Sequence, residues 1–204
     1  MTRNTINEEL IQQTINFHGH SCPGLALGIR AAELALAELG RASDEEMVAV
    51  VETDMCGVDA IQFLVGCTFG KGNLIHLDYG KNAFTFHRRS DGKAIRMVVR
   101  PEAFMDSDDD LNALRKKMVK GELTQEEQNR LKEALEARIK RIMEIELKQL
   151  FDIKPAQGPI PSKARILESL TCKACGEATM ESRTRRFRGQ ILCIPCFESV
   201  EKRY

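Results

Sequence analysis

Residues 84–99 read FTFHRRSDGKAIRMVV, in which two apolar segments flank Asp91-Gly92. Asp-Gly is a preferred pair for the two-residue turn that joins antiparallel strands. Folding the chain around this turn pairs Phe86 with Met97 on one face. The same face carries Phe84 and Val99, and the other face carries Thr85, His87, Arg96 and Val98. The stretch therefore predicts a β-hairpin with one buried face.

The segments on both sides of this hairpin follow helical and strand patterns. Apolar residues recur at intervals of three and four, which predicts helices over 10–18, 25–39 and 58–65. Short apolar runs predict strands over 47–51 and 73–78. Thr124-Gln-Glu-Glu127 forms a capping box, and the helix that it opens is expected to reach about Leu150. Flanking helices and an antiparallel hairpin sheet predict an α+β core domain.

Prolines and cysteines divide the chain into three parts. Residues 154–162 hold three of the six prolines, which is typical of a linker. We therefore expect an α+β core over 1–153, a proline-rich linker over 154–164 and a small zinc-finger domain over 165–204. A segment of this length with few large apolar side chains needs a metal to fold.

Four cysteines in the last part have the spacing of a metal site. Two Cys-x2-Cys pairs, Cys172 with Cys175 and Cys193 with Cys196, stand 17 residues apart. This arrangement predicts a tetrahedral four-thiolate zinc site, and because such a site has no open position its zinc is structural. Four free cysteines, two disulfides or an iron site are the alternatives. Between the pairs, we expect a hairpin around Gly189-Gln190.

The same finger carries a run of positive charge. Its four arginines, interrupted by Phe187, are Arg183, Arg185, Arg186 and Arg188. Such a run can bind an acidic partner protein or a nucleic acid, or it can be a solvated hairpin face. The chain as a whole has a formal net charge of zero, which gives no general attraction to nucleic acid or to a membrane surface.

The location of the protein is inferred from its first residues and its thiols. Residues 1–9 are polar and no apolar segment follows, so we expect neither an export signal nor a membrane anchor. Seven cysteines is an odd number, and four of them fit a metal pattern. Reduced thiols in the cytoplasm are therefore favoured over a disulfide framework.

A second cluster of metal-ligating residue types precedes the second expected helix. His18, His20 and Cys22 lie within five residues, immediately before Pro23. The positive end of a helix dipole favours a thiolate at this position, so Cys22 is a candidate nucleophile or metal ligand. Cys56 stands in a similar place between a strand and a helix. A purely structural cap is the alternative for Cys22.

The sequence gives weaker functional signals at the other candidate residues. His18 and His20 alternate, and in extended chain they point in opposite directions, so both need not serve one site. Cys67 is expected to pack in a core. Lys71, in a glycine-rich loop, can contact an anion, although the loop lacks the spacing of a P-loop. His76 and His87 are expected to be ordinary half-exposed strand histidines.

Three separated blocks resemble one family. They are His18-Gly-His-Ser-Cys-Pro-Gly24, Glu52-Thr-Asp-Met-Cys-Gly-Val-Asp-Ala-Ile-Gln62 and Gly66-Cys-Thr-Phe-Gly-Lys-Gly-Asn-Leu74. Together they are similar to the FmdE family, that of the E subunit of formylmethanofuran dehydrogenase, in the variant with a C-terminal treble-clef-like zinc finger. The resemblance implies an α+β core, usually a homodimer, with a cleft lined by the first two blocks. By position His18, Cys22 and Cys56 match the candidate site residues.

The resemblance also implies a functional context. Members associate with molybdenum or tungsten formylmethanofuran dehydrogenase, which reduces carbon dioxide onto methanofuran in methanogenesis. Our leading hypothesis is a metal-binding accessory protein whose cleft, built from His18, His20, Cys22 and Cys56, holds a second zinc or another metal; whether the cleft is also catalytic stays open. The alternative hypothesis is a zinc-finger adaptor that binds a partner protein or nucleic acid through its basic hairpin.

Overall fold

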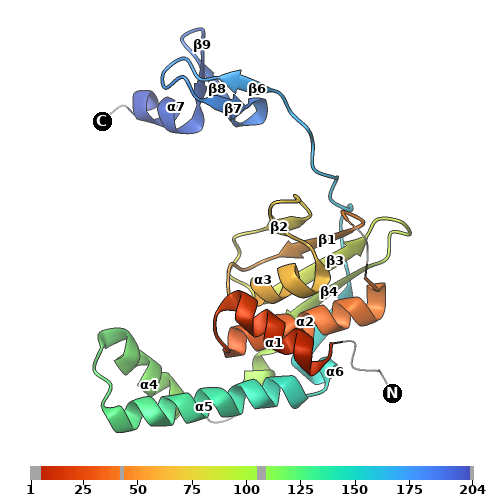
Figure 1. Ribbon diagram of the computed structural model, residues 1–204, viewed down its shortest axis with the longest axis vertical. Helices are drawn as coiled ribbons and strands as arrows, with labels where there is room; N and C mark the ends of the chain where they lie inside the picture. Colours follow the sequence, from red (N-terminus) through yellow and green to blue (C-terminus); the bar gives the residue numbers. More distant parts are fainter. Residues whose placement is uncertain (1–5, 42–43, 105–108, 203–204) are drawn as a thin grey trace. The chain divides into compact units, whose positions relative to one another are not determined.

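The computed structural model describes residues 6–41, 44–104 and 109–202 (Figure 1). The chain divides into two compact units, Met1–Lys163 and Ala164–Tyr204. None of the helices in the described ranges is long and apolar enough to cross a membrane.

The first unit is built on a five-stranded sheet. Its strands are β1 (Met47–Val51), β2 (Leu74–His76), β3 (Ala83–Arg88), β4 (Ala94–Val99) and β5 (Phe151–Pro155), in the order β2-β1-β3-β4-β5. Only β1 and β2 are parallel, and the other neighbouring pairs are antiparallel. With its helices this sheet confirms the α+β class.

The expected hairpin forms, but its register is shifted by two residues. Phe86 pairs with Ile95, and Phe84 pairs with Met97. The connection is wider than a two-residue turn, because Arg88 and Lys93 are the last hydrogen-bonded pair and Gly92 adopts a left-handed φ of 72°. A shift of two keeps each side chain on its predicted face, and the large apolar side chains of both strands are buried as expected.

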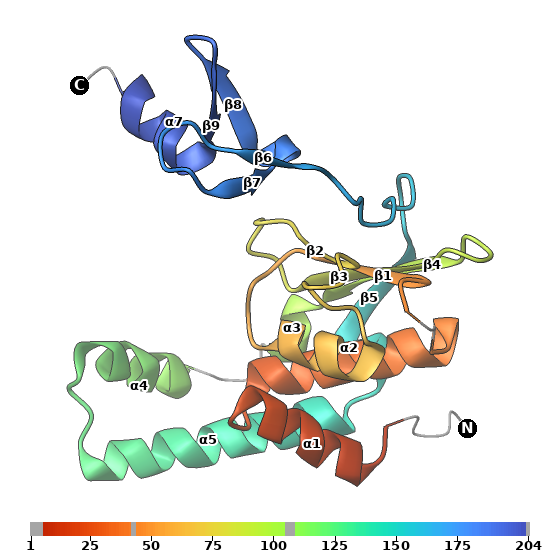
Figure 2. The same cartoon turned by 45° about the horizontal axis from the view of Figure 1, so that its top comes forward.

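Helices cover one face of the sheet (Figure 2). They are α1 (Glu8–His18), α2 (Pro23–Leu39) and α3 (Gly57–Ala60), followed directly by a π-helical turn, η1 (Ile61–Val65). The helix expected over 58–65 is thus α3 and η1 together. Most residues of α2 are buried, because this helix contacts α3, α5 and the sheet. A helix that is buried over most of its surface is typical of such a central position.

The charged segment after β4 forms a helical arm. It comprises η2 (Pro101–Phe104), α4 (Asp109–Lys120), α5 (Gln125–Glu144) and α6 (Leu147–Leu150). The helix expected to reach Leu150 ends at Glu144, where the carbonyl of Ile145 accepts a 2.7 Å hydrogen bond from Arg30 of α2. The chain then enters β5, which the sequence did not predict. Lys154 and Pro155, expected in the linker, belong to this strand.

The second unit is a small finger. It contains β6 (Ser169–Thr171), β7 (Ala178–Met180), η3 (Glu181–Arg183), β8 (Thr184–Phe187), β9 (Gln190–Cys193) and α7 (Ile194–Glu201). The β8–β9 turn was expected at Gly189-Gln190, but Phe187 pairs with Gln190, so the turn is Arg188-Gly189. Both turn residues have a left-handed φ, 49° and 80°, which a two-residue turn of the mirror-image type requires.

Candidate metal sites

Two glycines bring the first two sequence blocks together. Gly28 of α2 lies against Gly57 at the start of α3, and a Cβ added at Gly28 would stand 2.2 Å from the carbonyl oxygen of Gly57. Only residues without side chains allow this approach of two backbones. Near the start of α2, a Cβ on Gly24 would meet the Cβ of Cys56 at 3.3 Å. The crossing therefore places Cys56 beside the N-terminus of α2.

Four side chains converge at this point and form what we call the Cys/His cluster. Its members are His18, His20, Cys22 and Cys56, whose ligand atoms all lie within 4.8 Å of one another. Cys22 is the N-cap of α2, and its Sγ accepts the backbone N–H of Leu25 at 3.3 Å. The helix N-terminus thereby stabilises negative charge on this sulfur. His20 is exposed, and the other three residues are half-buried.

Both histidines belong to the cluster, although their alternation left this open. His18 ends α1, and Gly19 turns the chain with a left-handed φ of 94°. This turn removes the extended geometry in which alternate side chains diverge. The two imidazole rings consequently lie 4.4 Å apart between centroids, and Nε2 of His18 is 4.0 Å from Sγ of Cys22.

Asp59 contacts the cluster through His18. Its carboxylate lies 2.7 Å from Nδ1 of His18, so Nε2 is the ring nitrogen left to face the sulfurs. A carboxylate on the outer nitrogen fixes the tautomer and orientation of a metal-ligating histidine. The sequence placed Asp59 only near Cys56. The signal that could have assigned it is an acidic residue in the first turn of a helix that begins beside a candidate ligand.

The sulfur atoms of Cys22 and Cys56 lie within 4.8 Å of each other. Burial, and then the interaction of the Cys56 thiol with the negatively charged Cys22, raises the pKa of Cys56. Two thiolates this close repel each other unless a cation lies between them. The pair therefore has the electrostatics of a metal-ligand set.

Two other sequence candidates lie elsewhere. Cys67 is fully buried, its Sγ lies 3.5 Å from the carbonyl oxygen of Met47, and burial raises its pKa to about 12. The expectation that it packs in the core is confirmed. Lys71 is not in the cluster, and its ammonium lies 3.5 Å from the carbonyl oxygen of Asp44.

The finger holds the second group of ligands. The sulfurs of Cys172, Cys175, Cys193 and Cys196 also lie within 4.8 Å of one another. The Cys172 thiolate accepts backbone N–H groups, first that of Cys175 and then that of Cys193, which lower its pKa to about 6. The neighbouring Cys193 and burial raise the pKa of Cys196 to about 12. Four such sulfurs are all thiolates only when a cation compensates their charge.

Comparison with known proteins finds a matching family for each of the two units. Residues 17–152 match a family described as FmdE, molybdenum formylmethanofuran dehydrogenase operon. This chain belongs to the FmdE family. The resemblance seen in the three sequence blocks is thus confirmed. Residues 165–202 match the prokaryotic dksA/traR C4-type zinc finger, which agrees with the four-cysteine group.

Two known proteins are similar to this FmdE-family chain over most of its length. One is a tungsten formylmethanofuran dehydrogenase FmdE-like protein from Syntrophus aciditrophicus, known from a crystal structure. It is 25% identical with a TM-score of 0.61, and the match covers 97% of this chain and 94% of that one. The other is a probable S-adenosyl-L-methionine-binding protein of Archaeoglobus fulgidus, 34% identical over 195 residues. That alignment covers 92% of this chain and 52% of the relative, so the chain spans about half the length of this curated relative.

The geometry of this FmdE-family chain predicts an order of thiol reactivity. In metal-free protein, brief alkylation should label Cys22 about a hundredfold faster than Cys67, because the thiolate is the nucleophile and Cys67 is buried with a raised pKa. Peptide mapping after limiting labelling gives the ranking, with urea-unfolded protein as the control. Added zinc should protect Cys22 together with Cys56. If Cys67 reacts first, the accessibility of Cys22 in the Cys/His cluster is wrong.

Proposed function

We propose that the Cys/His cluster binds a zinc ion and that this protein is an FmdE-type accessory protein of a molybdenum or tungsten formylmethanofuran dehydrogenase. The observation that carries the proposal is the convergence of four ligand atoms within 4.8 Å. The family's description supports the link to that enzyme and to one-carbon metabolism of the methanogenesis type. Two clusters that need reduced thiols support a cytoplasmic location.

The ligand types favour zinc over magnesium or calcium. Thiolates and imidazoles suit zinc, whereas the harder cations prefer oxygen. His20, the exposed member, is the ligand most easily exchanged, and its departure would leave three protein ligands. A zinc ion with an open position acts as a Lewis acid. In this proposal Asp59 holds His18 in place, and the helix N-terminus stabilises the Cys22 thiolate.

Exposed apolar residues beside the cluster support docking to a partner protein. Phe17, which precedes His18, is 55% exposed, and Met55, which precedes Cys56, is 52% exposed. Large apolar side chains next to a polar site are common where a partner protein binds. The name of the A. fulgidus relative suggests another ligand, S-adenosyl-L-methionine. That ligand belongs to the relative's name alone, and this chain covers only about half of that protein.

Removing Asp59 tests the zinc proposal without touching a ligand. Asp59→Ala should weaken zinc binding at the Cys/His cluster by about 10- to 100-fold, because His18 loses the carboxylate that orients it. Competition with a chromophoric chelator measures the affinity. Asp54→Ala removes the same charge from an exposed neighbour and should change little. Equal effects of the two substitutions would contradict the positioning role of Asp59.

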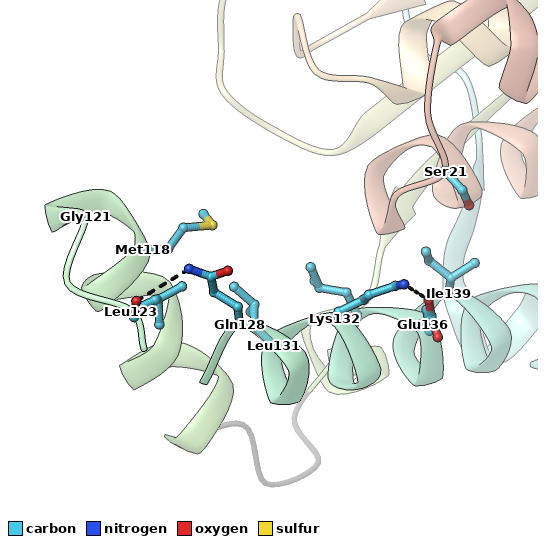
Figure 3. A pocket seen from close by; sticks show the side chains of 10 residues that line it. Ser21, Met118, Gly121, Leu123, Gln128, Leu131, Lys132, Glu136 and Ile139 are labelled. Atoms are coloured by element: carbon cyan, nitrogen blue, oxygen red, sulfur yellow. Dashed lines mark hydrogen bonds and ion pairs between the residues drawn. The ribbon is translucent and has the colours of Figure 1, made fainter. Parts of the chain in front are cut away.

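We also propose that the protein is a homodimer that uses its helical arm. A groove of about 550 Å³ runs along α4 and α5, with Ser21 of the loop between α1 and α2 at one end (Figure 3). Leu131, Leu135 and Ile139 of α5 line it. A hairpin around Asp91-Gly92 would by itself expose a sheet edge to a second copy of the chain, but β5 pairs with β4 and covers that edge. Leu135 and Ile139 are only half-buried beside this groove, and this apolar surface supports the proposal.

The dimer can be tested by sedimentation equilibrium. We expect a mass of twice the 23.0 kDa chain, and Leu135→Asp should weaken dimerisation at least about tenfold, because a charge would enter the apolar groove. Glu133→Ala, on the exposed side of α5, serves as the matched control. A single-chain mass at every concentration would refute the proposal.

A second candidate function, an adaptor that binds through the finger, rests on the arginines in and beside β8. Within the described ranges Arg183, Arg185 and Arg186 have no carboxylate partner, and the guanidinium of Arg188 lies over the Phe187 ring. Elsewhere in the chain several cations are paired, as Arg30 is with Glu33. Guanidinium groups without carboxylate partners can bind an acidic protein or a nucleic acid. In this function the finger zinc is the one metal required.

A further inference from the structure

The sheet face opposite α2 is covered by an irregular segment instead of a helix. Figure 2 shows the helices on one side of the sheet and the chain leaving β5 on the other. Residues 155–161, which we call the proline strap, follow this path. Arg89 holds the far end of the strap, because its guanidinium donates hydrogen bonds to the carbonyl oxygens of Pro161 and Ser162. The segment expected to be a free linker is thus tied to the sheet.

A cavity of about 430 Å³ lies between the sheet and the proline strap. Its sheet side is formed largely by polar residues, among them Glu52, Thr85, His87 and Arg96, and its strap side includes Pro159 and Pro161. A volume of this size is within the range of small-molecule sites. Apolar walls with a few convergent polar groups are typical of such sites.

Two of these polar residues are almost fully buried. Thr85 is 8% exposed and His87 only 4% exposed. The expectation that His87 is half-exposed is therefore wrong, because the strap covers its strand. Among the residues that the structure describes, neither the Thr85 hydroxyl nor the His87 ring has a hydrogen-bond partner. The Thr85 hydroxyl and the His87 ring nitrogens are not fully enclosed by the protein, and both residues line the cavity. Polar groups that open onto a cavity and have no protein partner are available to a ligand.

The charges around the cavity favour an anion. Arg96 donates from Nε and Nη2 to a single oxygen of Glu52, at 3.0 and 2.7 Å, and this leaves its Nη1 available. The guanidinium of Arg89 is bonded to carbonyl oxygens, so among the described residues no carboxylate neutralises it. Lys154 lines the edge, although its ammonium is paired with Asp152 at 2.5 Å. These two pairs leave the charge of Arg89 uncompensated, so the net charge of these groups is positive.

The protonation state of His87 is also compatible with a bound anion. Burial, and then the charge of Arg89, lowers the pKa of His87, so the ring is neutral at neutral pH. A neutral imidazole still carries one N–H donor. We propose that the cavity under the proline strap binds a small oxyanion, a carboxylate or a phosphate, through Thr85, His87 and Arg96. This site is separate from the Cys/His cluster, and it does not depend on the function proposed for that cluster.

Histidine NMR tests the site directly, because the chain has only four histidines. The zinc-loaded full chain is titrated with inorganic phosphate and, separately, with succinate, against sodium chloride at equal ionic strength. His87→Gln assigns the His87 ring resonance. We expect one of the two anions to shift this resonance saturably and to leave the exposed His76 unchanged. A response to phosphate alone or to succinate alone identifies the chemical class.

Thr85→Val gives the matched change in the cavity. It keeps the shape of a β-branched side chain, removes the hydroxyl donor and should weaken anion binding about tenfold. No shift of His87 with either anion, or equal shifts of His76 and His87, would overturn the proposal. A shift confined to His18 and His20 would place the anion at the Cys/His cluster, which overturns this inference and leaves the zinc proposal standing.

Discussion

Loss of zinc from the finger is expected to unfold residues 164–204 and to leave the first unit folded. The finger's buried core consists of Cys172, Leu192 and Cys193, with Phe187, Cys196 and Phe197 packed against it. A core of this size cannot offset the conformational entropy of some forty residues. Zinc binding to small four-ligand domains supplies about 10 kcal/mol or more, so nearly all of the finger's stability depends on the metal.

Hydrogen exchange tests this prediction, because it reports amide protection in each unit separately. Cys193→Ser, or treatment with a strong chelator, should remove amide protection from 164–204 while protection of β1, β3 and β4 persists. Cys22→Ser is the matched control, because it removes a thiol from the other cluster and should leave the finger protected. Unchanged protection of 164–204 in the Cys193→Ser protein would show that the finger folds without a complete zinc site.

Gly28→Ala is expected to destabilise the first unit by about 3 kcal/mol and to disrupt the Cys/His cluster. In an open helix this substitution would stabilise the protein by about 1 kcal/mol, because alanine has the higher helix propensity. Here the added methyl group would stand 2.2 Å from the carbonyl oxygen and 2.4 Å from the Cα of Gly57. Both are backbone atoms, so α3 must move and Cys56 moves with it.

The sign of the effect makes the substitution informative. Gly70→Ala is the control, since nothing lies within 4 Å of its added Cβ, and it should change the free energy of unfolding by only about 0.5 kcal/mol. Urea denaturation gives the stability, and chelator competition gives the zinc affinity of the cluster. If Gly28→Ala raises stability, the close crossing of α2 and α3 does not exist.

Local patterns in the sequence predict the elements of this fold well. The capping box at Thr124 opens α5, Pro23 begins α2, and Gly40 ends it. Each of these signals acts within a few residues, so interpreting it needs no knowledge of the rest of the chain. The buried face of the hairpin that carries Phe84 and Phe86 also follows from alternation alone.

Contacts between distant segments set the features that the sequence does not predict. The hairpin register depends on a turn wider than Asp91-Gly92 suggests, and α5 ends where Arg30, more than a hundred residues earlier, bonds the carbonyl of Ile145. β5 forms because β4 offers it an edge. The burial of His87 follows from the strap, a segment whose composition indicated only a linker.

The two candidate sites also differ in how far the sequence predicts them. The finger was predictable to the residue, because the spacing of its two cysteine pairs encodes the ligand geometry. The first cluster was predictable only as a set of residues. The left-handed turn at Gly19 joins its two histidines, and the Gly28–Gly57 contact brings in Cys56. The role of Asp59 follows only from its 2.7 Å contact with His18.

The zinc content of the protein tests the central claim that this chain holds two metal sites. Protein equilibrated with zinc and freed of excess metal can be measured by inductively coupled plasma mass spectrometry. We predict two zinc ions per chain in the wild type and one in the Cys22→Ser, Cys56→Ser double variant. One zinc per chain in both proteins would contradict a metal site in the Cys/His cluster and would favour the finger as the functional part of the molecule.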